Sequence, residues 1–255
     1  PAETVIAEFG TGQFEVNLTH TADALAAADQ MVALKRAIRG TARDQGLDAT
    51  FMPKPYGDRV GSGLHMHLSL QDAEGRNVFD SGGREPNARM RHAIAGMLRH
   101  MPDSTLVFAP HLNSYRRMVP GSFVPVEAHW AFDNRGSALR LPETAGPGAR
   151  IEHRVAGSDA NPYLATAAIL AAALAGLDAG EEPPAPVEGQ ITPGLGDPLP
   201  LSWAAAERRF SRSAFIADWL GDRFRHIFSA QKRQERARMM RLVTDREYEV
   251  YLRKV

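Results

Sequence analysis

The stretch that decides the fold runs from Gly61 to Leu70 and reads GSGLHMHLSL. From Leu64 onward apolar residues alternate with polar ones, and this period of two predicts a half-buried strand. Its polar face carries His65, His67 and Ser69. The Gly-Ser-Gly run allows a ligand close to the backbone, but it is not a P-loop because no Gly-Lys-Ser/Thr sequence follows. The two histidines could bind a metal, contact phosphate, or be hydrogen-bonded structural histidines.

A second alternating stretch runs from Arg150 to Val155. One face of this predicted strand carries Glu152 between Arg150 and Arg154. The arrangement is either a ladder of surface ion pairs or a metal ligand flanked by anion clamps. More arginines lie near short predicted strands and loops: Arg116, Arg117, Arg135 and Arg140. Guanidinium groups match phosphate geometry, so carboxylates and arginines together suggest phosphoryl transfer.

The N-terminal segment, residues 5–18, predicts a β-hairpin around Gly10-Thr11-Gly12-Gln13. A four-residue loop over those positions pairs Glu8 with Glu15. Like charges directly opposite each other are destabilising unless a cation lies between them. Carboxylate oxygens suit Mg²⁺ or Mn²⁺, although two ordinary solvent-facing glutamates would give the same pattern.

Helical spacing of apolar residues predicts helices over residues 23–45, 87–101 and 161–180, and from 202 to the end. Between the last two, residues 181–200 are rich in Pro and Gly and predict a surface loop. Residues 110–125 predict another loop.

Composition excludes several classes of protein. The chain has 255 residues, with 30 basic and 30 acidic side chains and a formal net charge of zero, so neither nucleic acid nor a membrane is expected as a partner. It has no cysteine, which excludes disulfides and thiolate metal sites and fits a cytoplasmic location. The longest apolar stretch, residues 164–177, is shorter than a bilayer span and predicts a buried helix.

Five motifs, in order and spacing, resemble the catalytic domain of the glutamine synthetase family. They are Glu8 to Glu15; Thr50 to Pro55 with Gly61 to His67; Asn113 to Arg117; Asn134-Arg135 with Arg150 to Arg154; and Ala160 to Leu164. The resemblance implies an α/β (α+β) fold similar to guanidino kinases, with a curved antiparallel sheet whose concave face forms the site and helices behind it. It covers residues 1–255 as one catalytic domain, of which 181–255 is the helical C-terminal part.

The resemblance also implies roles for individual residues. Two divalent ions, Mg²⁺ or Mn²⁺, would be held by Glu8 with Glu15 and by His65 with Glu152. ATP would contact His67, Ser69, Arg140 and Arg150. Glutamate would be seated by Gly61, Arg117 and Arg154, and the catalytic arginines would be Arg135, beside the transferring phosphoryl group, and Arg117. The reaction implied is ATP-dependent activation of the glutamate γ-carboxylate to an acyl phosphate, which ammonia or an amine then attacks.

Three positions depart from the family pattern. Family members that use ammonium carry a glutamate on a flap two residues before a proline, where this chain has Phe123. A phenyl ring can neither attract ammonium by charge nor accept its proton, so the departure predicts a larger or less charged amine. In addition, Val60 replaces an asparagine that is usual there, and Asp133 replaces an arginine at a tolerant position.

The family's N-terminal β-grasp domain and first catalytic strand are missing from this sequence, so the resemblance implies a fragment. The full-length protein is expected to be a homo-oligomer, a dodecamer of two hexameric rings. No counterpart of the family's modifiable tyrosine segment is evident at residues 181–200. Two alternatives stay open: a catalytically silent structural or regulatory subunit, and a guanidino kinase.

Overall fold

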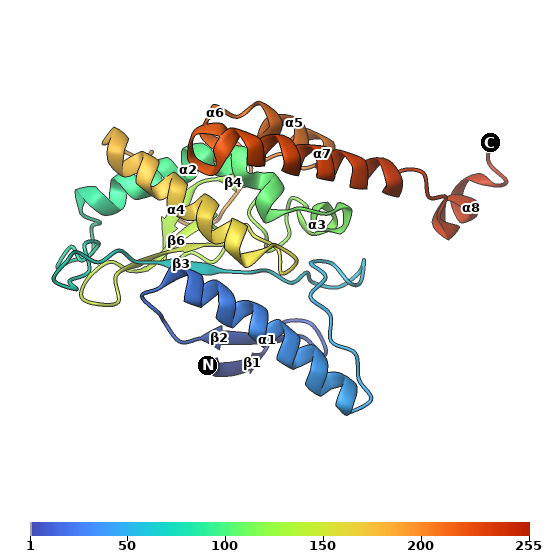
Figure 1. Ribbon diagram of the computed structural model, residues 1–255, viewed down its shortest axis with the longest axis horizontal. Coiled ribbons are helices and arrows are strands. Elements are labelled where there is room, and N and C mark those ends of the chain that lie inside the picture. Colours follow the sequence, from blue (N-terminus) through green and yellow to red (C-terminus); the bar gives the residue numbers. More distant parts are fainter. Residues whose placement is uncertain (1) are drawn as a thin grey trace.

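The computed structural model describes residues 2–255. Figure 1 shows a central sheet with α2, α4 and the C-terminal helices on one side, and an N-terminal hairpin with α1 on the other. The elements are β1 (Ala2–Ala7), β2 (Phe14–Leu18), α1 (Ala24–Asp44), β3 (Met66–Leu68), α2 (Ala88–Phe108), α3 (Leu112–Arg117), β4 (Glu127–Ala128), β5 (Trp130–Phe132), β6 (Leu139–Glu143), β7 (Arg150–His153), α4 (Pro162–Ala179), β8 (Asp197–Pro198), α5 (Trp203–Arg212), α6 (Ala214–Ile216), the π-helical turn η1 (Ala217–Gly221), α7 (Asp222–Met239) and α8 (Asp245–Tyr251).

The central sheet has the strand order β3-β7-β6-β5. β3 and β6 pair antiparallel with β7, and their register places His67 and Arg140 on either side of Glu152. The prediction of an antiparallel sheet is wrong for β5 and β6, which run parallel with Trp130 opposite Leu139. The short loop 133–138 returns the chain to the start of β5. Parallel strands usually need a connection of a dozen or more residues, so a loop this short does not predict such a pairing.

The alternation predicted for β3 is confirmed, although the strand proper is short. Its apolar side chains pack against the hydrophobic core, whereas His65 and His67 lie on the other face beside Glu152. The apolar members are Leu64, Met66, Leu68 and Leu70. This orientation fixes which face of the sheet carries the polar groups.

The core centres on the contact between α2 and α4. A Cβ atom at Gly96 or Gly176 would collide with the backbone of the opposite helix, so these two glycines allow the helices to pack closely. Asn161 caps α4 by accepting hydrogen bonds from the amides of Tyr163 and Leu164. α2 continues past its predicted end and through Pro102 to Phe108, because its last turns are buried in the core.

By length and composition alone, α4 could cross a membrane. Core helices pass the same test, and α4 contributes Ala165, Ala168, Ile169 and Ala172 to the core against α2. Its packing identifies it as the buried helix that the sequence predicts.

The N-terminal hairpin forms, but its predicted register is wrong. Ile6 lies opposite Glu15, and the amide of Glu8 donates to the carbonyl of Gln13 at 2.9 Å. The turn closes one residue earlier than predicted, over residues 9–12, with Gly12 at φ 74°. Glu8 and Glu15 therefore lie on the same face as diagonal neighbours and not directly opposite.

The C-terminal part differs from the single predicted helix. Residues 181–200 run along β4 and β5, and β8 pairs with β4. Beyond them the chain is broken into several helices, and its buried anchors are Trp203, Phe210, Phe215 and Phe228. In the region 110–125, predicted as loop, the short helix α3 carries the Asn-Ser-Tyr motif.

Candidate functional site

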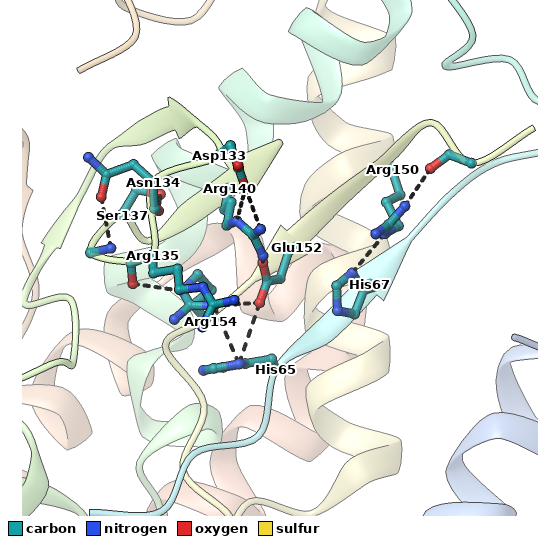
Figure 2. A network of polar contacts seen from close by, with 12 residues as sticks. His65, His67, Asp133, Asn134, Arg135, Ser137, Arg140, Arg150, Glu152 and Arg154 are labelled. Atoms are coloured by element: carbon teal, nitrogen blue, oxygen red, sulfur yellow. Dashed lines mark hydrogen bonds and ion pairs between the residues drawn. The ribbon is translucent and has the colours of Figure 1, made fainter. Parts of the chain in front are cut away.

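Glu152 lies at the centre of the polar face of the sheet, and Figure 2 shows the groups that converge on it. Its carboxylate is 3% exposed. One oxygen accepts from Arg140 Nη1 at 2.8 Å and the other from Arg154 Nη1 at 2.5 Å. A buried carboxylate is stable only when it is paired and hydrogen-bonded, and the two arginines supply both.

These charges also set the protonation states. Burial alone would raise the pKa of Glu152, but the charge of Arg154 and the hydrogen bond from Arg140 hold the pKa below its ordinary value. His65 Nδ1 lies 3.4 Å from the same carboxylate. Burial and the charge of Arg154 lower the pKa of His65 to about 3. The imidazole is therefore neutral at physiological pH and keeps a lone pair for a metal ion.

Each arginine is held at a second point. Arg140 Nε donates to Asp133 Oδ1 at 2.9 Å, and Arg154 Nε donates to the carbonyl of Arg135 at 3.1 Å. Asp133, noted in the sequence only as a departure from the family pattern, thus orients Arg140. The side chain of Arg135 itself is exposed.

His67 and Arg150 lie further along the same face (Figure 2). Arg150 Nε donates to His67 Nδ1 at 3.2 Å, and its Nη1 donates to the carbonyl of Gly148 at 2.9 Å. Ser69 is half-buried just beyond the end of β3. The groups predicted to bind nucleotide therefore line one face of the sheet with Glu152 at its centre.

Arg117 is buried behind the Gly-Ser-Gly loop and is 6% exposed. Its Nη1 donates to the carbonyl of Val155 at 2.9 Å, and burial lowers its pKa to about 10. A Cβ atom at Gly61 would lie 2.9 Å from Arg117 Cγ, and one at Gly63 would lie 2.7 Å from Arg117 Nη2. Both glycines are thus needed for the arginine to fit. Direct contact of Arg117 with glutamate stays a prediction.

The hairpin carries the second pair of carboxylates to the site. Burial, together with the proximity of Glu8, raises the pKa of Glu15. The charge of Glu152 contributes to the same rise. Two carboxylates this close are stable only with a proton or a cation between them.

Gln13 joins the hairpin to the sheet, and sequence reasoning missed it. Its Nε2 donates to the carbonyl of Gly61 and to Ser62 Oγ, both at 3.0 Å. From the sequence, Gln13 was expected only to be a turn residue between Gly12 and Phe14. No local sequence pattern predicts its contact with Gly61 and Ser62, which lie far from it in the chain.

The Asn-Ser-Tyr motif positions the loop before the signature. Asn113 exchanges two hydrogen bonds with the backbone of Lys54, at 2.9 and 3.0 Å. Ser114 Oγ donates to Asp159 at 2.6 Å, and His111 Nδ1 contacts the same carboxylate oxygen at 2.9 Å. The sequence predicted none of these positioning roles.

Phe123 on the flap is 70% exposed and packs against Phe9, whose ring centroid is 5.2 Å away. Phe9 is 80% exposed and directly follows Glu8, to whose carboxylate its amide donates at 3.2 Å. The flap therefore meets the hairpin through two aromatic rings beside the carboxylate pair.

The donor sets can be tested for their fit to divalent cations. In residues 2–255, three or more His, Asp or Glu side chains do not gather in any one place to hold a metal. Glu8 with Glu15 fits a hard cation, because their mutual repulsion is what such an ion relieves. His65 with Glu152 fits through the neutral imidazole and the remaining lone pairs of a carboxylate that already accepts from two arginines. Each pair supplies two ligands.

Comparison with known proteins agrees with these motifs. Residues 1–251 match the family model described as glutamine synthetase, catalytic domain. The chain is 42% identical over 253 residues to gamma-glutamylputrescine synthetase PuuA of Escherichia coli (strain K12), covering 99% of this chain and 54% of that protein. It is 36% identical to a glutamine synthetase of Halobacterium salinarum, covering 97% and 56% of the two chains.

A solved structure described as a GmaS/ADP complex has a TM-score of 0.89 to this chain at 30% identity, covering 98% of this chain and 60% of that one. This similarity confirms the α/β fold. The chain spans about half the length of the two named relatives.

Proposed function

Because this chain belongs to the glutamine synthetase family, we propose that the whole protein uses ATP to join the γ-carboxylate of glutamate to an amine. Membership of this family decides against the guanidino kinase alternative. The activity is proposed for the full-length protein, since this chain covers about half of its relatives.

The observation that carries the proposal is the environment of Glu152. One buried carboxylate is fixed between Arg140 and Arg154 and lies beside His65 and His67, while Glu8 and Glu15 form a second carboxylate pair on the hairpin. Such a face combines cationic groups for phosphate oxygens with carboxylates for cations, and phosphoryl transfer needs both.

The reaction has two steps. An oxygen of the glutamate γ-carboxylate attacks the γ-phosphorus of ATP, the bond to the β-phosphate oxygen breaks, and ADP leaves. The nitrogen of the amine then attacks the acyl carbon of γ-glutamyl phosphate, phosphate leaves, and the nitrogen loses a proton. Charge on the phosphate oxygens must be neutralised in both steps.

The side chains divide this work. His67, Arg140 and Arg150 line the face that would bind the nucleotide, with Ser69 just beyond the end of β3, and Arg135 would neutralise the transferring phosphoryl group. Gly61, Arg117 and Arg154 would seat glutamate. Mg²⁺ or Mn²⁺ bound by Glu8 with Glu15 and by His65 with Glu152 would supply further positive charge.

For the acceptor we propose an amine larger than ammonium. The flap presents Phe123 against Phe9, so two phenyl rings lie next to Glu8. Phenyl rings favour alkyl chains, and their faces attract an organic ammonium group without accepting its proton. Similarity to gamma-glutamylputrescine synthetase supports this choice.

The test is glutamate-dependent phosphate release from ATP by the full-length protein with Mg²⁺, with ammonium compared against polyamines and amino alcohols. The expected result is a γ-glutamylamide product, identified by mass, formed at least about tenfold faster than glutamine, or 1.4 kcal/mol in transition-state selection. Ammonium as the best acceptor would refute the choice of a larger amine. No phosphate release with any acceptor would refute the ligase and favour the catalytically silent subunit.

We also propose that the full-length protein is a cytoplasmic homo-oligomer, the double ring of two hexamers that the family resemblance implies. Exposed apolar side chains on the hairpin, Val5 and Phe14 at 62% and 67% exposure, support burial against other chain segments or subunits. Mass photometry of the full-length protein tests the proposal, and a monomer would contradict it.

A further inference from the structure

Residues 184–199, called the strap here, run along the open edge of the central sheet. β5 is the last strand in the sheet order, so one side of its backbone faces away from β6. The strap pairs with that side: the amide of Val187 donates to the carbonyl of Trp130 at 2.8 Å, and Trp130 Nε1 donates to the carbonyl of Pro184 at 2.7 Å. These bonds anchor the first part of the strap.

The far end of the strap is anchored separately. β8 pairs with β4, and the Glu127 carboxylate accepts from the amides of Gly194, Leu195 and Gly196 at 2.8, 2.9 and 3.2 Å. Hydrogen bonds from these amides, above all that of Gly194, lower the pKa of Glu127. A Pro/Gly-rich segment held at both ends is ordered by its contacts and not by its own propensity.

Between its anchors the strap touches the turn that contains Arg135. Asn134 Nδ2 donates to the carbonyl of Gly189 at 2.8 Å, while Asn134 Oδ1 accepts from the amide of Gly136 at 2.9 Å. Ile191 packs directly on Gly136, where a Cβ atom would lie 2.9 Å from Ile191 Cγ1. One asparagine side chain thus ties the strap to the turn, and one isoleucine fills the space beside it.

The inner side of the same turn is tied to the site. Arg154 Nε donates to the carbonyl of Arg135, and Arg154 Nη1 donates to Glu152 (Figure 2). The backbone of Arg135 is therefore clamped between the strap outside and the ion-pair network inside. The strap and the ion-pair network together fix the Cα position from which the exposed Arg135 side chain extends.

We propose that the strap positions Arg135. Asn134 and Ile191 are positioning residues: they hold the turn, and the turn holds Arg135 in place. The proposal rests on the proposed function, in which Arg135 neutralises the transferring phosphoryl group. A displacement of about 1 Å in such a group can lower the rate roughly a hundredfold. The strap is thus a determinant of turnover although it touches no substrate.

The experiment uses the full-length protein and measures kcat and KM for Ile191→Ala, with Leu195→Ala as the matched control. Leu195 is on the same strap but is 41% exposed, and only its backbone amide contacts Glu127. Both substitutions are also made together with Arg135→Ala. Hydrogen exchange of residues 133–139 reports the order of the turn independently of activity.

We expect Ile191→Ala to lower kcat roughly tenfold with KM for ATP and glutamate changed less than about twofold, and to speed exchange in residues 133–139. Leu195→Ala leaves both readouts close to those of the parent. In the Arg135→Ala background, Ile191→Ala has no further effect on kcat.

Two results would overturn the strap proposal while leaving the proposed function intact. In the first, Ile191→Ala has no more effect than Leu195→Ala. In the second, Ile191→Ala lowers kcat equally in the parent protein and in Arg135→Ala. Full turnover by Arg135→Ala would instead refute the role that the proposed function gives Arg135. The positioning proposal would fall with that role, even if exchange still showed that the strap orders the turn. The two failures are therefore distinguishable.

Discussion

Glu152 and Glu15 are both strand glutamates predicted to bind a metal ion, yet their surroundings are opposite in kind. Glu152 is buried on the central sheet between Arg140 and Arg154, which hold its pKa low. Glu15 is half-buried on a two-stranded hairpin beside Glu8, and burial with that second carboxylate raises its pKa. One carboxylate already has its positive partners within the chain, whereas the other has a like-charged neighbour.

This difference separates a prebuilt half of the site from one that needs an added charge. In the sheet half, Glu152 accepts hydrogen bonds from Arg140 and Arg154 and lies beside His65. The hairpin half is joined to it by Gln13 and by the contact of Phe9 with Phe123. A cation between Glu8 and Glu15 would supply what the hairpin lacks.

The largest effect expected is a loss of stability in Glu152→Ala, which removes the centre of the sheet half. Removing one partner of a buried ion pair leaves the others buried and unpaired, so the free energy of unfolding should fall by about 3–5 kcal/mol. Denaturant unfolding measures the change. Glu15→Ala is the control and should change stability by no more than about 1 kcal/mol. Equal losses for the two variants would mean that the halves are not different.

Glu8→Gln and Glu15→Gln should not destabilise the protein in the absence of metal. Each removes a charge from a repelling pair, so the melting temperature without metal should stay or rise. The rise in melting temperature on adding Mn²⁺ should shrink, and ligase turnover should fall by more than about a hundredfold, since several kcal/mol of charge stabilisation is lost. Thermal melts with and without Mn²⁺ are the measurement. An unchanged Mn²⁺ effect in both variants would contradict a metal site on the hairpin.

Phe123→Glu sharpens the comparison at the flap. A carboxylate beside the hairpin would attract ammonium, so the ratio of kcat/KM for ammonium to that for a larger amine should rise about tenfold, or 1.4 kcal/mol. Val119→Glu adds the same charge to the flap at a position 49% exposed and serves as the control. A ratio that moves equally in both variants would show that the charge acts from a distance and not through position 123.

The smallest effect concerns pH and His129, a buried histidine next to β5. His129 is 3% exposed, its Nδ1 has no hydrogen-bond partner, and burial lowers its pKa. Below its ordinary pKa of 6.5 the unfolded chain takes up a proton that the folded protein does not, so stability falls as pH drops through that value. His129→Leu should flatten this fall by at most about 1.4 kcal/mol per pH unit. Unfolding curves between pH 7 and 5 measure it, with the exposed His20→Leu as a control expected to have a smaller effect.

The elements with strong periodicity could be predicted from the sequence. The alternation after Leu64 and around Glu152 placed the histidines and arginines on the correct faces, because side chains of a strand alternate whatever the tertiary structure. Helices α1 and α4 begin directly after Asp23 and Asn161, whose side chains accept hydrogen bonds from the first amides of each helix. These are local properties.

The features that the sequence did not predict depend on contacts between residues distant in the chain or on the exact geometry of a turn. The predicted turn of the hairpin lies one residue too late in the chain, so the predicted strand register was wrong. Turns at neighbouring positions of a Gly-rich loop differ little in local energy, so the sequence does not choose between them. The parallel pairing of β5 and β6, the contact of Gln13 with Gly61 and the attachment of the strap to Asn134 link segments that no short pattern relates. Candidate site residues could be listed from the sequence, and their roles stay predictions, whereas the residues that position them could not be listed.

The most direct test of a prebuilt sheet half and a cation-dependent hairpin half is hydrogen exchange of the full-length protein with and without Mn²⁺. We predict that amides of residues 150–156 are already protected without metal and change little, whereas amides of residues 2–18 gain protection when Mn²⁺ is added. Equal gains in both segments, or rapid exchange in residues 150–156 without metal, would contradict the account.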